Sequence, residues 1–205
     1  MSEPLFSKKN LKLLSDPMNN SNPITVQVLG ICSALAVTAQ LKPSIVMAIS
    51  VTAVLALANV IISLLRNTIP NRIRIIVQLV VIAALVILVD QVLKAYVFDV
   101  SRQLSVFVGL IITNCIIMGR AEAFYSQNNI FHSVLDSVAN GFSYTYTLVA
   151  IAIVREILGF GTLLGFQIMP ETFPKWVVIS MAPGAFFVVS LFIWITRTLA
   201  KVESD

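Results

Sequence analysis

The sequence predicts an all-α integral membrane protein with six transmembrane helices, arranged as two inverted repeats of three helices. Hydrophobic residues make up 58% of the 205 residues and charged residues 12%, whereas about a quarter of the residues in a soluble domain are charged. The mean hydropathy of +0.91 agrees with this composition. Six stretches contain no Asp, Glu, Lys or Arg, and the first and fourth are among the shorter ones and carry polar residues. The first helix of each repeat is therefore expected to be short or broken.

The six charge-free stretches are the candidate helices: Ile24–Leu41, Pro43–Leu65, Ile75–Val89, Gln103–Gly119, Ser137–Val154 and Trp176–Thr196. A helix needs roughly 20 residues to cross about 30 Å of hydrocarbon. The second and sixth stretches meet that length alone, the third meets it by continuing to Lys94, and the fifth meets it with its flanks. The first and fourth carry polar residues inside them, which favours interrupted helices.

The candidate helices group as three plus three within one domain. We expect a polar basic segment at 1–21, a first repeat at 22–100, a second repeat at 101–200 and a polar tail at 201–205. Each repeat opens with a cysteine-bearing segment and continues with an apolar segment that ends at an arginine, Arg66 or Arg155. Three crossings per repeat place the repeats in opposite orientations, and in such folds matched short segments indicate the functional site.

The distribution of positive charge predicts the orientation of the chain. With six crossings, nine Lys and Arg residues fall on the side of the termini and five on the other, which favours cytoplasmic termini. No signal peptide is apparent in the first 23 residues, which form either a short interfacial helix or a basic tail. The net charge of +4 is too small to indicate nucleic-acid binding. We therefore expect a multi-pass protein surrounded by lipid.

The two cysteines, Cys32 and Cys115, are the residues most suited to chemistry, and each lies inside an apolar stretch. Arg120 follows Cys115 by five residues, which is about 7 Å along a continuous helix. A charge that deep in hydrocarbon is costly and usually faces protein or water. A broken helix at each cysteine would resolve this, and Gly30 and Asn114 suit such breaks because protein can bury irregular backbone.

Two deep thiols have two interpretations. A buried cysteine is most often a small hydrophobic residue with no further role. Alternatively, both thiolates bind a metal centre, but zinc or a plain [2Fe–2S] cluster takes four ligands and this chain has two cysteines. A cluster would therefore sit at a subunit interface, completed either by a second copy of the chain or by a related subunit inserted the other way up.

Five segments resemble a known family: Asn22–Thr38, Ser63–Pro70, Arg74–Gln78, Val89–Tyr96 and Gln103–Phe124. They resemble the D-subunit family of bacterial sodium-translocating NADH:quinone reductases, and they are similar to the E subunit of Rnf-type electron-transport complexes as well. The serine after Cys32 and the run Val89–Lys94 are closer to the sodium-pumping reductase. The resemblance covers nearly the whole chain from residue 22 onward.

The resemblance implies one subunit of a six-subunit inner-membrane complex that passes electrons from NADH to ubiquinone and exports Na⁺. It implies that Cys32 and Cys115 are two of the four ligands of a [2Fe–2S] cluster shared with the E subunit of the reductase, a homologous subunit of opposite topology. The resemblance also implies that flavins and quinone belong to other subunits. This chain is expected to bind neither NADH nor another nucleotide, since it has no glycine-rich phosphate loop. The chain would not be catalytic alone, and the cluster would divide a roughly 30 Å electron path.

Four residues are candidates to tune such a cluster. Thr113, Asn114 and the backbone at Gly30 could hydrogen-bond the sulfurs, which would affect the cluster potential. Arg120 could balance the negative charge of the cluster, pair with Glu122 or anchor the helix at the interface.

Two other classes of function stay open from the residues. One is a secondary transporter that uses the inverted repeats for alternating access and has inert cysteines. The other is a structural scaffold, in which Cys32→Ala and Cys115→Ala would be silent. Within the electron-transfer class, the alternative is an Rnf-type subunit, which would act between ferredoxin and NAD.

The remaining polar residues favour structural roles. Asp90 could belong to a sodium path, but Lys94 at i+4 favours an ion pair. Arg155, like the arginine that ends the matching segment of the first repeat, is expected to anchor a helix end by reaching to headgroups. His132 is expected in a solvated loop, and Pro183–Gly184 is expected to kink the last helix.

Overall fold

The computed structural model describes residues 22–65, 69–70, 72–96, 108–125, 130–164, 166–167 and 176–200. The polar segment 1–21, the tail 201–205 and Arg66 lie outside the described residues. What is described is almost entirely helical. The one sheet in this part of the chain consists of two antiparallel strands of two residues each, β1 (Thr162–Leu163) and β2 (Phe166–Gln167). Thr162 pairs with Gln167.

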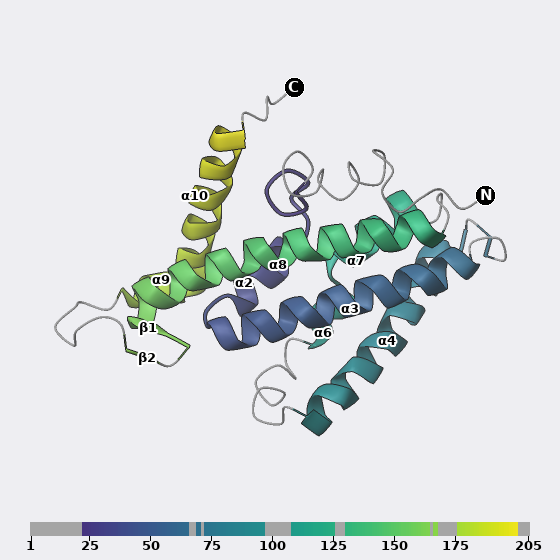
Figure 1. The fold of residues 1–205 in the computed structure, drawn as a ribbon, viewed down its shortest axis with the longest axis horizontal. Coiled ribbons are helices and arrows are strands. Elements are labelled where there is room, and N and C mark those ends of the chain that lie inside the picture. The colour runs from purple at the N-terminus through teal and green to yellow at the C-terminus, as the bar shows by residue number, and fades with distance from the viewer. Residues whose placement is uncertain are drawn as a thin grey trace.

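Two long helices, α3 (Leu41–Leu65) and α8 (Ile130–Phe160), form the centre of the molecule. They lie side by side over much of their length (Figure 1). Gly141 allows a close approach, because a Cβ there would lie 2.5 Å from Cγ2 of Thr52. Small residues at such contacts are typical of helix pairs in membranes, where packing replaces the hydrophobic effect as the driving force.

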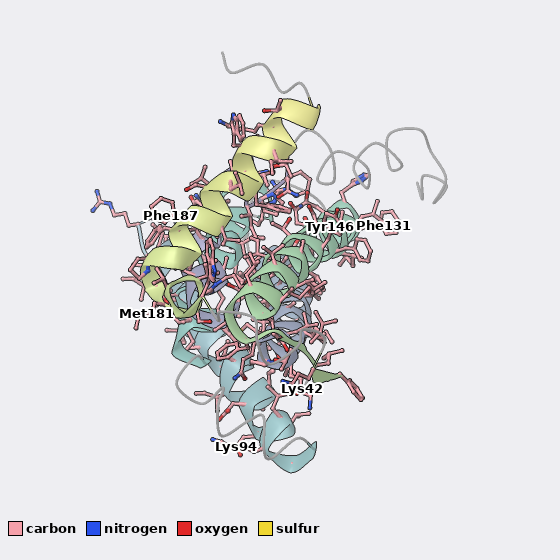
Figure 2. All side chains as sticks on the ribbon, turned by 90° about the vertical axis from the view of Figure 1, so that its left-hand side faces the viewer. Lys42, Lys94, Phe131, Tyr146, Met181 and Phe187 are labelled. Carbon is pink, nitrogen blue, oxygen red and sulfur yellow. The ribbon has the colours of Figure 1, made fainter. Side chains whose placement is uncertain are left out.

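Two outer helices pack on this pair from opposite ends. Helix α4 (Arg74–Tyr96) packs on α3, and α10 (Ala182–Ala200), preceded by the short α9 (Val177–Ser180), packs on α8 (Figure 1). Both outer helices expose apolar side chains. Phe187 of α10, labelled in Figure 2, is 78% exposed. Such faces suit contact with lipid or with other membrane subunits.

The cysteine-bearing segments are broken, as the sequence predicts. Residues 23–30 form turns before α2 (Ile31–Val37), and α6 (Val108–Ile112) is separated from α7 (Cys115–Arg120) by Thr113 and Asn114. A π-helix, η1 (Ala121–Tyr125), continues α7. The break expected at Asn114 is confirmed, while at Gly30 a helix begins and the described residues before it are not helical.

Three described helices are long and apolar enough to span a membrane: Leu41–Leu65, Arg74–Ala95 and Phe131–Phe160. A shorter apolar helix covers Ala182–Thr198. The prediction of a helical membrane protein is therefore confirmed, while six crossings in inverted repeats stay a prediction. One expectation is wrong: His132 lies within α8 and not in a loop, because α8 begins at Ile130, well before the charge-free stretch.

The last apolar stretch is interrupted between α9 and α10, close to the kink expected at Pro183–Gly184. The chain turns at Met181, and Gly184 then packs against the backbone of α9. A Cβ on Gly184 would overlap the carbonyl oxygen of Val178 and Cα of Ile179. These neighbours are backbone atoms, so they cannot move aside as a side chain can.

We expect Gly184→Ala to destabilise the subunit by about 1–3 kcal/mol, because the added methyl group overpacks a backbone contact. Gly109→Ala is the matched control, since nothing lies within 4 Å of a Cβ at that position. The measurement is the midpoint temperature of unfolding of the purified membrane complex. Equal midpoints for the two variants would show that the α9–α10 turn is not packed as described.

Candidate functional site

The two thiols meet although 83 residues separate them in the chain. The Sγ atoms of Cys32 and Cys115 lie 3.7 Å apart, and both cysteines are free thiols. Cys32 is the second residue of α2 and Cys115 is the first residue of α7. The structure therefore brings the two cysteine segments together within one chain.

The residue before each short helix sets where that helix begins. Asn114 caps α7, since its Oδ1 accepts a hydrogen bond from the backbone N–H of Ile116 at 3.2 Å. Gly30 precedes α2 with a φ of +80°, a left-handed conformation that favours glycine. A Cβ on Gly30 would also lie 3.1 Å from the ring of Tyr144, so the position is restricted twice.

Three buried polar side chains, joined by hydrogen bonds, lie next to the cysteines on the interior side. The Ser33 hydroxyl lies 2.7 Å from the Tyr144 hydroxyl and donates to the Gly30 carbonyl at 2.8 Å. The Asn114 amide nitrogen donates to Ser33 Oγ at 3.4 Å. Ser33, Asn114 and Tyr144 are all 0% exposed. The cysteines are therefore backed by a closed hydrogen-bonded set drawn from three helical segments.

Tyr144 was not singled out by sequence reasoning. It lies in the charge-free stretch of α8 between Ser143 and Thr145, and the one signal available was that a phenol needs a hydrogen-bond partner when buried. Tyr144 is the fifteenth of the 31 residues of α8. The cysteines therefore lie level with the middle of α8, while the mid-depth position in the membrane expected for Cys32 stays a prediction.

The front of the cysteine pair is open. Cys32 is exposed and Cys115 is half-buried, in contrast to the fully buried residues behind them. The two sulfurs thus reach the surface of the chain, beside the middle of α8.

The spacing of the sulfurs fits two ligands of one metal ion. Two thiolates on a tetrahedral ion, each bonded at about 2.3 Å as in zinc sites, lie about 3.8 Å apart. The observed 3.7 Å agrees with that value. Within the described residues no group of three or more His, Cys, Asp or Glu side chains is positioned to hold a metal. The described residues therefore offer two thiols at one point, and a centre with four ligands would need the other two from elsewhere.

Thr113 and Arg120, two further candidates, use their side chains on other groups. The Thr113 hydroxyl donates to the carbonyl of Gly109 at 3.3 Å and is exposed. Arg120 donates from Nη2 to Asp136 Oδ1 at 3.0 Å, and its guanidinium lies 6.0 Å from the centre of the Phe124 ring. Asp136 is 3% exposed, so the two charges compensate one another inside the protein.

Glu122, an alternative partner for Arg120, bonds to helix α4. Its carboxylate accepts hydrogen bonds from Arg74 and, at 3.4 Å, from the amide of Gln78. The charges around the second cysteine segment therefore include two ion pairs, Arg120–Asp136 and Arg74–Glu122. The predicted ion pair of Asp90 with Lys94 is also confirmed, with 2.5 Å between Oδ2 and Nζ.

The expectation that Arg155 anchors a helix end in headgroups is wrong. Helix α8 continues five residues beyond it to Phe160, and Arg155 is 1% exposed. Its guanidinium donates to Thr38 Oγ1 at 2.6 Å and to three backbone carbonyls: Leu35 at 3.3 Å, Ile179 at 3.3 Å and Ser180 at 3.0 Å. Arg155 therefore ties the end of α2 to the α9–α10 turn.

The neighbouring Glu156 has a related role that the sequence did not indicate. One carboxylate oxygen accepts the backbone N–H of Leu41 at 2.6 Å, and the other accepts that of Leu164 at 2.9 Å. Leu41 is the first residue of α3, so Glu156 satisfies a free N–H at that helix start. Arg155 and Glu156 together satisfy backbone groups left unpaired where helices begin and end.

The sequence matches a family model described as "Rnf-Nqr subunit, membrane protein" over residues 10–193. Among curated proteins, the D subunit of the Na(+)-translocating NADH-quinone reductase of Aeromonas hydrophila is 55% identical over 192 residues, which is 91% of each chain. The D subunit of Haemophilus ducreyi is 52% identical over 200 residues, covering 94% of this chain and 96% of its own. That of Pseudoalteromonas atlantica is 48% identical over 204 residues, 97% of each chain.

Proposed function

Because the chain belongs to the Rnf-Nqr family of membrane subunits, we propose that it is the D subunit of a sodium-translocating NADH:ubiquinone reductase. In this role Cys32 and Cys115 supply two of the four ligands of a [2Fe–2S] cluster at the middle of the membrane. The complex transfers electrons from NADH to ubiquinone and exports Na⁺, and the curated relatives that carry this name are full-length matches.

The observation that carries the proposal is the pair of thiols, 3.7 Å apart at the surface of the chain. Their spacing suits one tetrahedral ion, and their exposure leaves room for a second protein to supply the remaining ligands. A bound cluster accepts and releases one electron at a time. The residues of this chain hold the thiols together, exclude water from behind them and bring them to the level of the centre of α8.

The partner that suits these thiols is a homologous subunit of opposite topology, corresponding to the E subunit of the reductase. Each half of this chain places a cysteine at the start of a short helix, and the outer helices α4 and α10 leave the central pair at opposite ends (Figure 1). This arrangement supports two inverted three-helix repeats. We propose six crossings with both termini in the cytoplasm of a bacterial cell, an orientation supported by the nine-to-five distribution of Lys and Arg. A partner built the same way would present two matching cysteines.

Surrounding residues would adjust the properties of the centre. Asn114 and Gly30 hold the cysteine-bearing helices at their first residues. Arg120 keeps a positive charge on α7, although its ion pair with Asp136 reduces the net charge felt at the thiols. Thr113 would contribute through its backbone, since its hydroxyl is bonded to Gly109. An Rnf-type subunit is the second candidate, because the matching family model includes both groups.

Iron analysis and low-temperature paramagnetic resonance of the purified complex test this proposal. We expect the purified complex to contain the iron and the [2Fe–2S] signal of this centre when both this subunit and its homologous partner are present, and to lack both when the partner is deleted. The chain alone supplies two ligands and cannot close the coordination of a cluster. Iron bound stoichiometrically without the partner, or none in the intact complex, would contradict the shared centre.

A further inference from the structure

We propose that Tyr144 is a positioning residue that fixes the two cysteine-bearing helices relative to one another and raises the reduction potential of the centre they hold. This inference rests on the proposed function, because it requires Cys32 and Cys115 to be ligands. It concerns a residue of α8 that does not itself offer a ligand. Its basis is the set of contacts behind the thiols.

The hydrogen bonds in this set have one consistent direction. Ser33 donates its hydrogen to the Gly30 carbonyl at 2.8 Å, so the hydrogen shared with Tyr144 at 2.7 Å comes from the phenol. Ser33 Oγ also accepts from the Asn114 amide at 3.4 Å. A hydroxyl has one hydrogen and two lone pairs, and all three are used here. Removing the phenol hydroxyl would therefore leave one buried acceptor position unfilled.

Through these contacts, Tyr144 of α8 is connected to the residues next to both cysteines. Ser33 directly follows Cys32, and Asn114 directly precedes Cys115. The ring of Tyr144 also packs against Gly30, where an added Cβ would lie 3.1 Å from the ring edge. Tyr144 thus contacts the start of α2 by ring and hydroxyl and is joined to the start of α7 through Ser33.

The short helices need such a support. Helix α2 has seven residues, and α7 has six before it continues as the π-helix η1. Isolated helices shorter than about 12 residues are only marginally stable. Their positions must therefore be set by contacts with longer elements. Tyr144 is fully buried near the midpoint of the 31-residue α8, which makes it a rigid point of attachment.

The same contacts predict an electrostatic effect. The hydrogen end of the phenol dipole points at Ser33 Oγ, so the phenol places a partial positive charge against the residue that directly follows Cys32. Positive potential near a metal–thiolate centre stabilises the more negatively charged reduced form. Loss of this dipole should therefore lower the reduction potential.

The test is Tyr144→Phe in the complete complex, with Tyr146→Phe as the control. Tyr146 lies two residues along the same helix and is 61% exposed (Figure 2), so its variant removes the same hydroxyl from the surface. We expect Tyr144→Phe to retain iron, to shift the midpoint potential of the paramagnetic signal downward with altered g values, and to slow quinone reduction by roughly 10-fold. Tyr146→Phe should match the wild type.

Ser33→Ala supplies a second, independent variant, because it removes the atom that receives the phenol hydrogen. It should lower the potential in the same direction, and the double variant should show less than the sum of the two shifts, as residues in one network do. Two results would overturn the positioning role. One is that the shifts in midpoint potential of the two single variants add up in the double variant. The other is that Tyr144→Phe and Ser33→Ala have the same midpoint potential and g values as Tyr146→Phe.

The outcome also separates this inference from the proposed function. If the signal disappears on replacement of either cysteine but is unchanged in Tyr144→Phe, the positioning role alone fails. If the signal survives replacement of both cysteines, the thiols are not ligands and the proposed function fails first.

Discussion

Replacing Cys32 or Cys115 by alanine should abolish the paramagnetic signal of the cluster in the assembled complex and stop electron flow from NADH to quinone. Each substitution removes one of the two thiols proposed as ligands. No third His, Cys, Asp or Glu is grouped with them among the described residues, so no such side chain is placed to take the vacated position. Replacing residues that merely orient ligands costs 10- to 100-fold in activity, so we expect a loss of more than about 100-fold here.

The measurements are the paramagnetic spectrum, the iron content and NADH-driven quinone reduction in membranes with equal amounts of complex. Ala36→Ser is the matched control, because Ala36 lies one turn beyond Cys32 on the exposed side of α2. It should keep both signal and turnover. A transporter or scaffold with inert cysteines predicts that both alanine variants behave like this control, and that result would refute the ligand assignment.

Replacing Arg155 by methionine should prevent the subunit from accumulating in the membrane. The substitution preserves length but removes hydrogen bonds to the Thr38 hydroxyl and to the carbonyls of Leu35, Ile179 and Ser180. Hydrogen bonds from a charged donor contribute about 1.5–3 kcal/mol each. Losing several together approaches the roughly 5–15 kcal/mol of stability that a whole domain has.

Arg197→Met distinguishes this role from a headgroup anchor. Arg197 lies in the last turn of α10 and is exposed, which is the environment the sequence suggested for Arg155. Immunoblots of membranes and the unfolding midpoint of the complex should show a severe loss for Arg155→Met and little change for Arg197→Met. Equally mild effects would mean that Arg155 does not hold α2 to the α9–α10 turn.

Much of the site was accessible from the sequence because its determinants are local. The apolar stretches indicate helices through their length alone, and the resemblance drawn from five segments is confirmed by the family match and by relatives 48–55% identical. The helix start at Gly30 and the break at Asn114 follow from a residue suited to left-handed backbone and a residue suited to capping. The Asp90–Lys94 pair follows from i+4 spacing on one helix.

The residues that sequence reasoning misjudged are those whose partners are distant in the chain. Arg155 seemed to end a helix, but its four acceptors lie about 120 residues before it or 24–25 residues after it. The sequence did not indicate a role for Tyr144, because its hydrogen-bond partner Ser33 is 111 residues away in the chain. The i, i+4 rule and the hydropathy of a stretch carry no information about such pairs.

The amino-acid order alone thus established a helical membrane protein, the helix start at Gly30, the break at Asn114, and its family. Its fold was needed to bring Cys32 within 3.7 Å of Cys115, to open that pair at the surface, and to place Tyr144 behind it. The reason is physical: backbone conformation responds to neighbouring residues, whereas buried hydrogen bonds between helices depend on which faces the packing brings together.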